Sequence, residues 1–512
     1  MNAEGERHQN GDVTGQGSRT RRGPGEAAEP AGQRVLSLAL LAVCLGYFMV
    51  ILDTTIVNVA LPALRQDLGA SVSGLQWVVD GYLLMLAALL LSGGVLTDRM
   101  GARRVFQLGL GLFVLASVGC GLAPSTVVLV IARLLQGVGA ALAVPASLAL
   151  LRAAYPEPAA RARAIGMWGG IAGVAAAAGP ILGGVLVTAA SWRLVFFVNV
   201  PIGLLAMVLT VRQVPAPEPR PRGLDPAAQV TGVLALAALT LALIEGGRAG
   251  LRPVVIVAAV VFVVSVAGFV VIERRVPAPM LPLGLFGNAM FSGGNAVGLL
   301  INLGFYGELF VINLYFQQLR GYSALVAGLA LLPQMGMAAI GSLLSGRFTA
   351  RAGSPRPTML IGLLIGGAGL FGLTIAGTHT PYPLLIAPLV AAGFGMSFTM
   401  PAATTAVVEG VPAERAGLAS GAINASRQIG GVIGVALLGA LVSASAAFIP
   451  GLRIAVIIAG AAFFTGALLT AMTVPRRPTA GQLVLSSVGA GHLVGDVAAE
   501  CRAEIGEHPI DP

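Results

Sequence analysis

Long apolar stretches separated by short polar turns run along nearly the whole chain of 512 residues. A helix needs about 20 mostly apolar residues to cross the hydrocarbon core of a bilayer. Fourteen stretches of this kind lie near 36–61, 75–96, 105–122, 126–151, 164–187, 194–211, 228–245, 253–272, 289–316, 323–345, 358–377, 383–408, 417–443 and 453–473. The pattern predicts an all-α integral membrane protein with 14 transmembrane helices.

Composition favours a membrane protein over a soluble one. Hydrophobic residues make up 56% of the chain and charged residues only 10%. Soluble proteins carry about 25% charged residues, and a soluble domain could not bury this much apolar surface. A lipid bilayer is therefore an expected partner of the chain.

The kinds of polar residue present exclude several classes of function. All 31 basic residues are arginine, and no lysine occurs. ATP hydrolysis at a P-loop needs a lysine on the phosphates, and Schiff-base or PLP chemistry needs a lysine amine. Cys44, Cys120 and Cys501 are too few and too scattered for a disulfide framework or a metal site. We expect no cofactor, no metal and no enzymatic activity.

The arginines are distributed unevenly between the two sets of loops. Arg99, Arg103 and Arg104 follow the second predicted span, and the alternate loops and both tails carry most of the others. Cytoplasmic loops collect basic residues. The bias predicts a multi-pass protein of the cell membrane with both termini in the cytoplasm. The net charge of +9 then reflects topology and not a nucleic-acid-binding surface.

Two sequence patterns recur at nearly the same spacing. Residues 94–104 share Gly, Thr, Arg, Gly and Arg with residues 346–356, and the Gly-x-Gly-x5-Pro-Ala pattern of 137–146 recurs at 393–402. The repeats predict two related six-helix halves. Transporters of this design bind substrate near the bilayer midplane between their halves, where helices are interrupted by Gly or Pro.

This repeat predicts five consecutive parts of the chain. They are a disordered cytoplasmic tail at 1–33, an N-terminal six-helix bundle at 34–212, a linker with two inserted helices at 213–276, a C-terminal six-helix bundle at 277–475 and a cytoplasmic tail at 476–512. The inserted helices are expected at the periphery.

Ionisable residues inside the predicted spans are candidates for function, because each costs roughly 2.5–3.5 kcal/mol to place in hydrocarbon. Counted from the helix ends, Asp53 and Arg133 lie about 13 Å deep and Glu308 about 15 Å deep. Apolar surroundings favour a protonated carboxyl, whereas a neighbouring arginine favours the carboxylate. Asp53, Arg133 and Glu308 are thus predicted to couple transport to protons. The alternative is a structural Asp53–Arg133 ion pair.

Other polar or helix-breaking residues in these spans are predicted to line a substrate pathway. They are Asn58, Gln136, Pro145, Asn302, Pro401, Asn424 and Arg427. Asp80 and Glu245 lie near predicted span ends, which favours an interfacial position for both.

Five motifs, in order, resemble those of the major facilitator superfamily, specifically its 14-helix drug:proton antiporter branch. Residues 52–62 are similar to the first-helix motif of the branch, and 94–104 to the superfamily's cytoplasmic loop motif. Residues 133–140 are similar to a fourth-helix motif whose arginine is associated with proton coupling. Residues 173–184 look like the fifth-helix motif of exporters, and 192–201 like the start of the sixth helix.

The resemblance spans roughly 36–475 and implies roles for two further groups of residues. The exporter motif of the fifth helix comprises Gly173, Gly179, Pro180, Gly183 and Gly184. The gating loop comprises Gly94, Asp98, Arg99, Gly101, Arg103 and Arg104. Asp98 and its arginines can pair across the halves and hold one state of a rocking equilibrium. Because Ala350 replaces this aspartate in the second copy, the latch is implied only for the first half.

These observations predict a secondary transporter that exports hydrophobic or amphipathic drugs or antibiotics in exchange for protons, without an obligate protein partner. A facilitator or importer of a small metabolite is the nearest alternative, and the exporter motif speaks against it. A membrane receptor or a membrane enzyme is disfavoured. A receptor requires neither the repeat nor charges at matched depth, and no cluster of His, Cys and carboxylates indicates an enzyme site.

Overall fold

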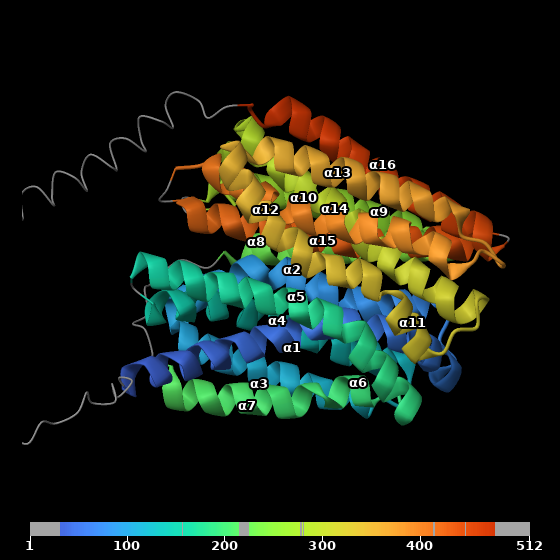
Figure 1. Ribbon diagram of the computed structural model, residues 1–512, viewed down its shortest axis with the longest axis horizontal. Coiled ribbons are helices and arrows are strands. Elements are labelled where there is room, and N and C mark those ends of the chain that lie inside the picture. Colours follow the sequence, from blue (N-terminus) through green and yellow to red (C-terminus); the bar gives the residue numbers. More distant parts are fainter. Residues whose placement is uncertain are drawn as a thin grey trace, which may run out of the picture.

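The computed structural model describes residues 31–155, 157–214, 225–276, 279, 281–412, 415–445 and 447–476. Most of both predicted tails and residues 215–224 of the predicted linker lie outside this part of the chain. The first helix begins at Ala31, inside the predicted N-terminal tail. Figure 1 shows that the first helix starts and the last helix ends at the same end of the bundle, here called the termini face. The opposite end is called the far face.

The described residues hold 14 helices long and apolar enough to cross a membrane, which confirms the predicted number. The main helices are α1 Ala31–Leu68, α2 Val72–Met100, α3 Ala102–Gly121, α4 Thr126–Ala154, α5 Pro158–Ala189, α6 Leu194–Phe197, α7 Asn199–Gln213, α8 Pro226–Ala249, α9 Pro253–Arg275, α10 Ala289–Leu314, α11 Ala324–Ala330, α12 Leu332–Ala352, α13 Pro355–Gly372, α14 Tyr382–Glu409, α15 Ala416–Ala444 and α16 Phe448–Thr473. Short turns η1 Leu283–Gly287, η2 Tyr315–Leu319 and η3 Leu373–Ile375 complete the described elements. The sixth span comprises α6 and α7, and the tenth comprises α11 and α12.

Two six-helix halves repeat the same packing, as the sequence repeat predicts. A Cβ on Gly137 of α4 would collide with the carbonyl oxygen of Tyr82 in α2, and one on Gly393 of α14 with that of Gln334 in α12. Gly139 and Gly395, two positions further on, meet α3 and α13 in the same way. Small residues let helix backbones approach closely inside a membrane. The recurring Gly-x-Gly pattern is therefore a packing signature of both halves.

The loop motif also has the same backbone shape in both copies. Gly101 ends α2 with φ of 90°, and Gly353 ends α12 with φ of 64°. A residue with a side chain rarely adopts such a positive φ, whereas glycine does so at little cost. The repeated glycine thus permits the tight turn into α3 and into α13.

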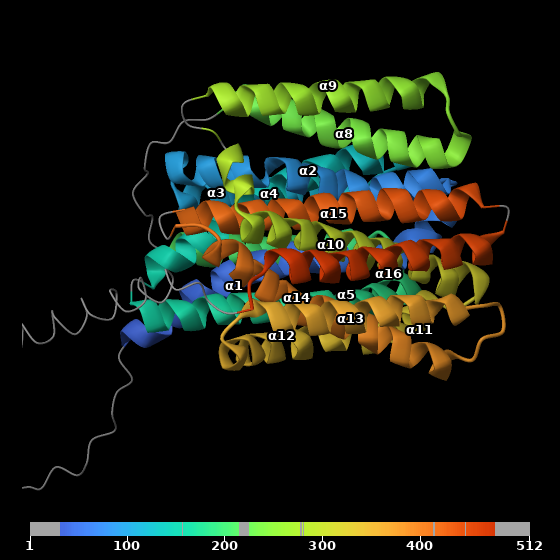
Figure 2. The same ribbon diagram turned by 90° about the horizontal axis from the view of Figure 1, so that it is seen from above.

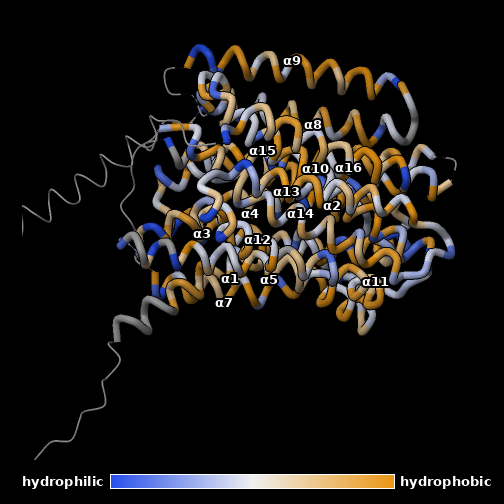
Figure 3. Tube along the Cα trace, turned by 45° about the horizontal axis from the view of Figure 1, so that its top comes forward, coloured by the Kyte–Doolittle hydropathy of each residue, from blue (hydrophilic) through white to orange (hydrophobic). Residues whose placement is uncertain are grey.

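The inserted helices α8 and α9 lie at one edge of the bundle (Figure 2). Gln229 of α8 donates from Nε2 to the carbonyl of Ala88 in α2 at 2.7 Å, and Gly247 packs against Ala440 of α15. Figure 3 shows α9 hydrophobic along most of its length. Its Val260 and Val263 are more than half exposed, as expected for a helix that faces lipid.

Hydrogen bonds join the two halves near the far face. Asn313 donates from Nδ2 to the carbonyl of Asn58, and Gln317 donates to that of Val59 at 3.0 Å. On the other side of the bundle, Gln76 of α2 donates to the carbonyl of Ala436 in α15 at 2.9 Å. These contacts tie α1 to α10 and η2, and α2 to α15.

The end of α5 nearer the termini face is packed differently. A Cβ added to Gly166, Gly169 or Gly170 would meet nothing within 4 Å in the described part of the chain. Toward the far face, Gly184 lies so close to α11 that a Cβ would stand 2.7 Å from Cα of Leu325. The halves are thus joined through α5 at the far face and separate along this helix toward the termini face.

Candidate functional site

Asp53 and Arg133 form an ion pair in the interior of the first half. The Nη1 atom of Arg133 in α4 contacts Oδ2 of Asp53 in α1, and the two side chains are 1% and 0% exposed. Sequence counting placed both residues at equal depth, and the structure brings them into direct contact. Burial this complete means that each charge depends on the other for its stabilisation.

Two amides complete the surroundings of the carboxylate. Gln136 donates from Nε2 to Oδ1 of Asp53 at 2.8 Å, and Asn199 at the start of α7 donates to the same oxygen at 3.0 Å. Gln136 also donates to Oγ of Ser117 at 2.9 Å and accepts from Nη1 of Arg133 at 2.7 Å. The network therefore links α1, α3, α4 and α7. Gln136, predicted to line the substrate pathway, is fully buried within it.

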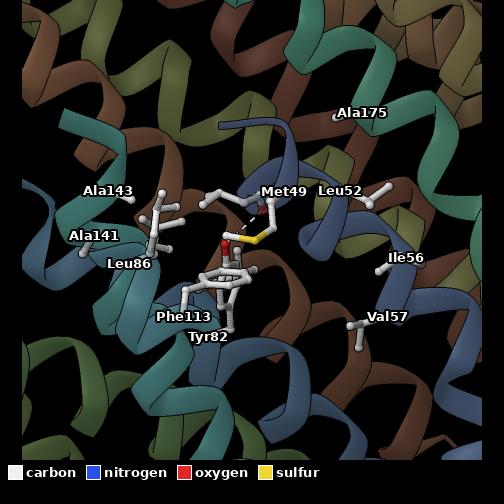
Figure 4. Close-up of a cluster of buried hydrophobic side chains, with 14 of the residues drawn as sticks. Met49, Leu52, Ile56, Val57, Tyr82, Leu86, Phe113, Ala141, Ala143 and Ala175 are labelled. Carbon is white, nitrogen blue, oxygen red and sulfur yellow. Dashed lines mark hydrogen bonds between the residues drawn. The ribbon is translucent and has the colours of Figure 1, made fainter. Parts of the chain in front are cut away.

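Backbone and aromatic groups hold the guanidinium of Arg133 from its other sides. Nε donates to the carbonyl of Val78 in α2 at 2.9 Å. The guanidinium carbon lies 4.4 Å from the ring centre of Tyr82 and 5.8 Å from that of Phe196. Figure 4 shows Tyr82 beside Met49 and Phe113, and its hydroxyl donates to the carbonyl of Val50 at 3.0 Å. Arg133 is therefore enclosed by aromatic rings and hydrogen-bond acceptors.

Glu308, predicted to act with this pair, lies in the other half. It is fully buried in α10, where Gln334 of α12 donates to its Oε2 at 2.6 Å. Its second oxygen, Oε1, has no hydrogen-bond partner among the described residues. Asp53 and Arg133 are therefore in direct contact, whereas Glu308 binds Gln334 in the second half and is not part of their network.

Asp80, predicted to lie at the membrane interface, is enclosed by protein. The residue is fully buried in α2, and neither carboxylate oxygen has a hydrogen-bond partner in the described part of the chain. Asp80 lies one turn beyond Gln76, which bonds to α15, so both residues face the second half. The distance of Asp80 from the end of its predicted span does not reveal this burial, because it results from the packing of α15 on that side of α2. Glu245 is half-buried in α8.

The residues predicted to line the substrate pathway differ in their burial and in their partners. Asn302 is buried and donates to the carbonyl of Gly298 at 2.9 Å. Asn424 is half-buried in α15 and accepts from Nη1 of Arg427 at 3.2 Å. Pro145 lies inside α4 and packs against Gly93 of α2.

Two other predicted pathway residues take part in hydrogen bonds between a side chain and a main-chain carbonyl of the same helix. Pro401 of α14 accepts from the Thr405 hydroxyl at 3.0 Å through its carbonyl. Asn58 donates to the carbonyl of Thr54 at 3.0 Å, while its own carbonyl joins the contact between the halves. No contact shows which of these residues meets substrate, so their role in the pathway stays a prediction.

Glycines of the predicted exporter motif bring α5 against two other helices. A Cβ on Gly179 would lie 2.8 Å from Cβ of Thr55 in α1, and one on Gly183 would lie 2.9 Å from the carbonyl oxygen of Ile56. Pro180 is buried beside Gly328 of α11, and Gly173 is half-buried. The motif therefore allows α5 to pack closely on both halves.

The predicted gating loop lies at the termini face. Gly94 is near Pro145, with 4.0 Å from its added Cβ to Cβ of the proline. Arg103 donates from Nη2 to the carbonyl of Val211 at 2.6 Å, inside the same half. Pairing of Asp98, Arg99 or Arg104 across the interface stays a prediction.

Comparison with protein families gives one match over most of the chain. The family model described as "Major Facilitator Superfamily" matches residues 43–435 and 338–495. The "Methylenomycin A resistance protein" of Bacillus subtilis (strain 168) is 37% identical over 434 residues, covering 84% of this chain and 92% of that protein. The "Tetracenomycin C resistance and export protein" of Streptomyces glaucescens is 38% identical over 413 residues, covering 79% of this chain and 75% of that protein.

The fold is also similar to a solved transporter structure. A bacterial homologue of the human lysosomal transporter Spinster, in an inward-facing and unoccupied conformation, matches with a TM-score of 0.63. The match covers 87% of this chain and 98% of that one at 18% sequence identity. This likeness concerns the fold alone.

Proposed function

The chain belongs to the major facilitator superfamily, and on this premise we propose that it exports hydrophobic or amphipathic drugs, antibiotics among them, across the cytoplasmic membrane in exchange for protons. Two relatives that match most of the chain are named for antibiotic resistance, one of them also for export. The buried Asp53–Arg133 ion pair is the main observation that supports the proposed coupling to protons.

Proton entry supplies enough energy for uphill export. One elementary charge that moves through 100 mV releases about 2.3 kcal/mol, and each unit of pH difference adds about 1.4 kcal/mol. A tenfold concentration gradient of a neutral substrate costs about 1.4 kcal/mol. A cycle of one or two protons therefore suffices.

The network links the charge on Asp53 to the position of α1. The ionised carboxylate accepts hydrogen bonds from Arg133, Gln136 and Asn199. A proton on Asp53 removes its attraction to Arg133 and one acceptor site, which loosens α1 from α4. Asn58, little more than one turn further along α1, carries the carbonyl that binds Asn313 of the other half. Protonation can thus change the stability of the far-face contact, as a two-state transporter requires.

Asp80 and Glu308 are additional proton-binding candidates. Each has at least one buried carboxylate oxygen without a partner in the described residues. A buried carboxylate without donors is costly, whereas the neutral acid is tolerated. Asp80 lies where α2 meets α15, so its charge bears on the contact between the halves.

The proposed export is tested by resistance and accumulation in a drug-sensitive host that lacks its major efflux pumps. We expect cells that produce the protein to tolerate several-fold more of at least one hydrophobic antibiotic and to accumulate less of it. A protonophore should abolish the difference in accumulation, because it removes the driving force. If the difference persists in the presence of the protonophore, export is not coupled to protons. Unchanged resistance and accumulation across a broad panel would contradict drug export.

The proposed orientation places the termini face in the cytoplasm. A reporter that is active only in the cytoplasm is expected to work when fused after residue 477 and to fail when inserted at His379, between α13 and α14. A second reporter that is active only outside should give the reverse pattern. Activity of the cytoplasmic reporter at His379 alone would contradict this orientation.

The proposed latch concerns Asp98 in the loop after α2. Asp98→Asn removes a charge with little change of shape, so substrate binding should persist while the transport rate falls severalfold. Ala350→Asp, at the matching position of the second half, is the control and should change little. Substrate binding and transport rate, measured on the same preparations, test whether Asp98 acts as a latch. Normal transport by Asp98→Asn would leave the loop as a determinant of topology only.

A further inference from the structure

Arg427 is a cation deep in the bundle that has no counter-ion among the described residues. It lies eleven residues after Ala416 at the start of α15, which is about 16 Å along the helix. Its Nη1 donates only to Asn424 on the same helix, and its buried Nε has no partner among the described residues. No carboxylate in that part of the chain forms an ion pair with it. Arg133, by contrast, has a carboxylate, a backbone carbonyl and an amide as partners.

The side chain of Arg427 lies between the two halves. A Cβ on Gly298 of α10 would stand 3.4 Å from its Cγ, so α10 packs on the stem of the arginine. Gly431, one turn further along α15, lies against the ring of Tyr306, with 3.3 Å from an added Cβ to Cδ2. The same Cβ on Gly431 would lie 3.8 Å from Cδ1 of Leu83 in α2, a helix of the first half. Arg427 therefore lies where α10 and α15 of the second half meet α2 of the first half.

A rigid aromatic pair lies near this cation on the first half. Tyr47 of α1 stacks on Trp168 of α5 with ring centres 3.8 Å apart and planes inclined by 11°. Trp168 is fixed by donating from Nε1 to Oγ of Ser147 at 3.2 Å. The phenol of Tyr47 lies within electrostatic range of the charge on Arg427. Both rings are half-buried, which leaves aromatic surface available for a ligand.

We propose that Arg427 is the anion-binding group of the substrate site and that the protein carries aromatic acids, either carboxylates or ionised phenols. An uncompensated arginine at this depth is costly unless it meets a partner, and its planar donors match a carboxylate. The Tyr47–Trp168 pair offers a flat apolar surface for the aromatic part of the same ligand. The transport of such acids rests on the proposed export function, whereas their binding can be measured separately.

The test compares the binding of three ligands to purified protein in lipid nanodiscs. All three ligands contain the same naphthalene ring system and differ in charge. Naphthoate is an anion, naphthamide is neutral and naphthylmethylammonium is a cation. We expect naphthoate to bind about tenfold or more tightly than naphthamide, because a charge-assisted hydrogen bond is lost in the amide. The ammonium compound should bind most weakly. Equal affinities, or preference for the cation, would overturn the inference without requiring any variant.

Matched variants separate the charge from the aromatic surface. Arg427→Gln should bring naphthoate down to the affinity of naphthamide, while Trp168→Leu should weaken both probes by a similar factor. Arg453→Gln changes an exposed arginine of α16 that bonds to Thr374, and it should leave all three affinities unchanged. A preference for naphthoate that survives in folded Arg427→Gln would overturn the assignment.

Export measured alongside distinguishes the inference from the function on which it rests. Proton-driven export of a neutral antibiotic, together with equal binding of naphthoate and naphthamide, would refute the acid preference and keep the exporter. Selective naphthoate binding without proton-driven export of any compound tested would support the anion site and contradict the exporter.

Discussion

Arg133→Ala is expected to abolish transport and to lower the free energy of unfolding by about 3–5 kcal/mol. The substitution leaves the carboxylate of Asp53 buried without its cation, and it removes the donor to Val78 and the guanidinium between Tyr82 and Phe196. An unpaired buried charge is the main cost, because the two remaining amide donors carry no formal charge.

Thermal unfolding and transport measured on the same preparation test this expectation. Arg453→Ala is the control, because that arginine bonds to a backbone carbonyl at an exposed position and should affect neither property. The double variant Asp53→Asn/Arg133→Ala should be more stable than Arg133→Ala alone, since it no longer contains the unpaired carboxylate. If the single and double variants were equally stable, the buried charge would not be the source of the loss.

Asp53→Asn is expected to abolish uphill transport in a protein that still folds. Asparagine keeps the shape of the side chain and can still meet Gln136 and Asn199, but it cannot bind and release a proton. The cost in stability should be smaller than for Arg133→Ala, because Arg133 keeps its contacts with the carbonyl of Val78, the amide of Gln136 and the ring of Tyr82. Downhill exchange of substrate should persist. The measurement is gradient-driven accumulation beside downhill exchange in proteoliposomes, with the melting temperature recorded in parallel.

Asn199→Ala is the matched control for this experiment. It removes one donor to the same carboxylate oxygen but leaves the titratable group and its arginine in place. It should reduce the rate without abolishing uphill transport. Full uphill transport by Asp53→Asn would contradict its role as proton carrier. Lower stability with normal coupling would favour the alternative of a structural ion pair.

Hydrophobic length and helical rise were sufficient to predict the number of spans and a common depth for Asp53 and Arg133. Depth in a membrane follows from counting residues, so two charges at equal depth can be matched before their helices are placed. The span boundaries were less accurate. The first span was expected to end before Pro62, yet α1 continues through Pro62 to Leu68. A helix does not stop where the apolar stretch stops, because its polar last turn can extend into water.

Helix rotation could not be predicted from the same patterns. Glu308 lies at nearly the depth of Asp53, but it faces Gln334 in its own half. Asp80 lies near a span end, but it faces α15 and is fully buried. The side of a helix that is covered depends on which helix packs there, and residue counting within one span does not contain that information. For the same reason, the Tyr47–Trp168 stack and the contribution of Asn199 emerge only from the packing of helices within the first half.

Substrate-driven proton movement in proteoliposomes is the most direct test of proton-coupled export. Vesicles that contain the protein and a pH-sensitive dye are loaded with a neutral compound identified in the resistance assay and then diluted into buffer of the same pH. Exchange of substrate for protons predicts that the lumen becomes acidic as the compound leaves, and that Asp53→Asn shows no such change. Exit of the compound through the wild-type protein with no change in luminal pH, or with alkalinisation, would contradict proton antiport.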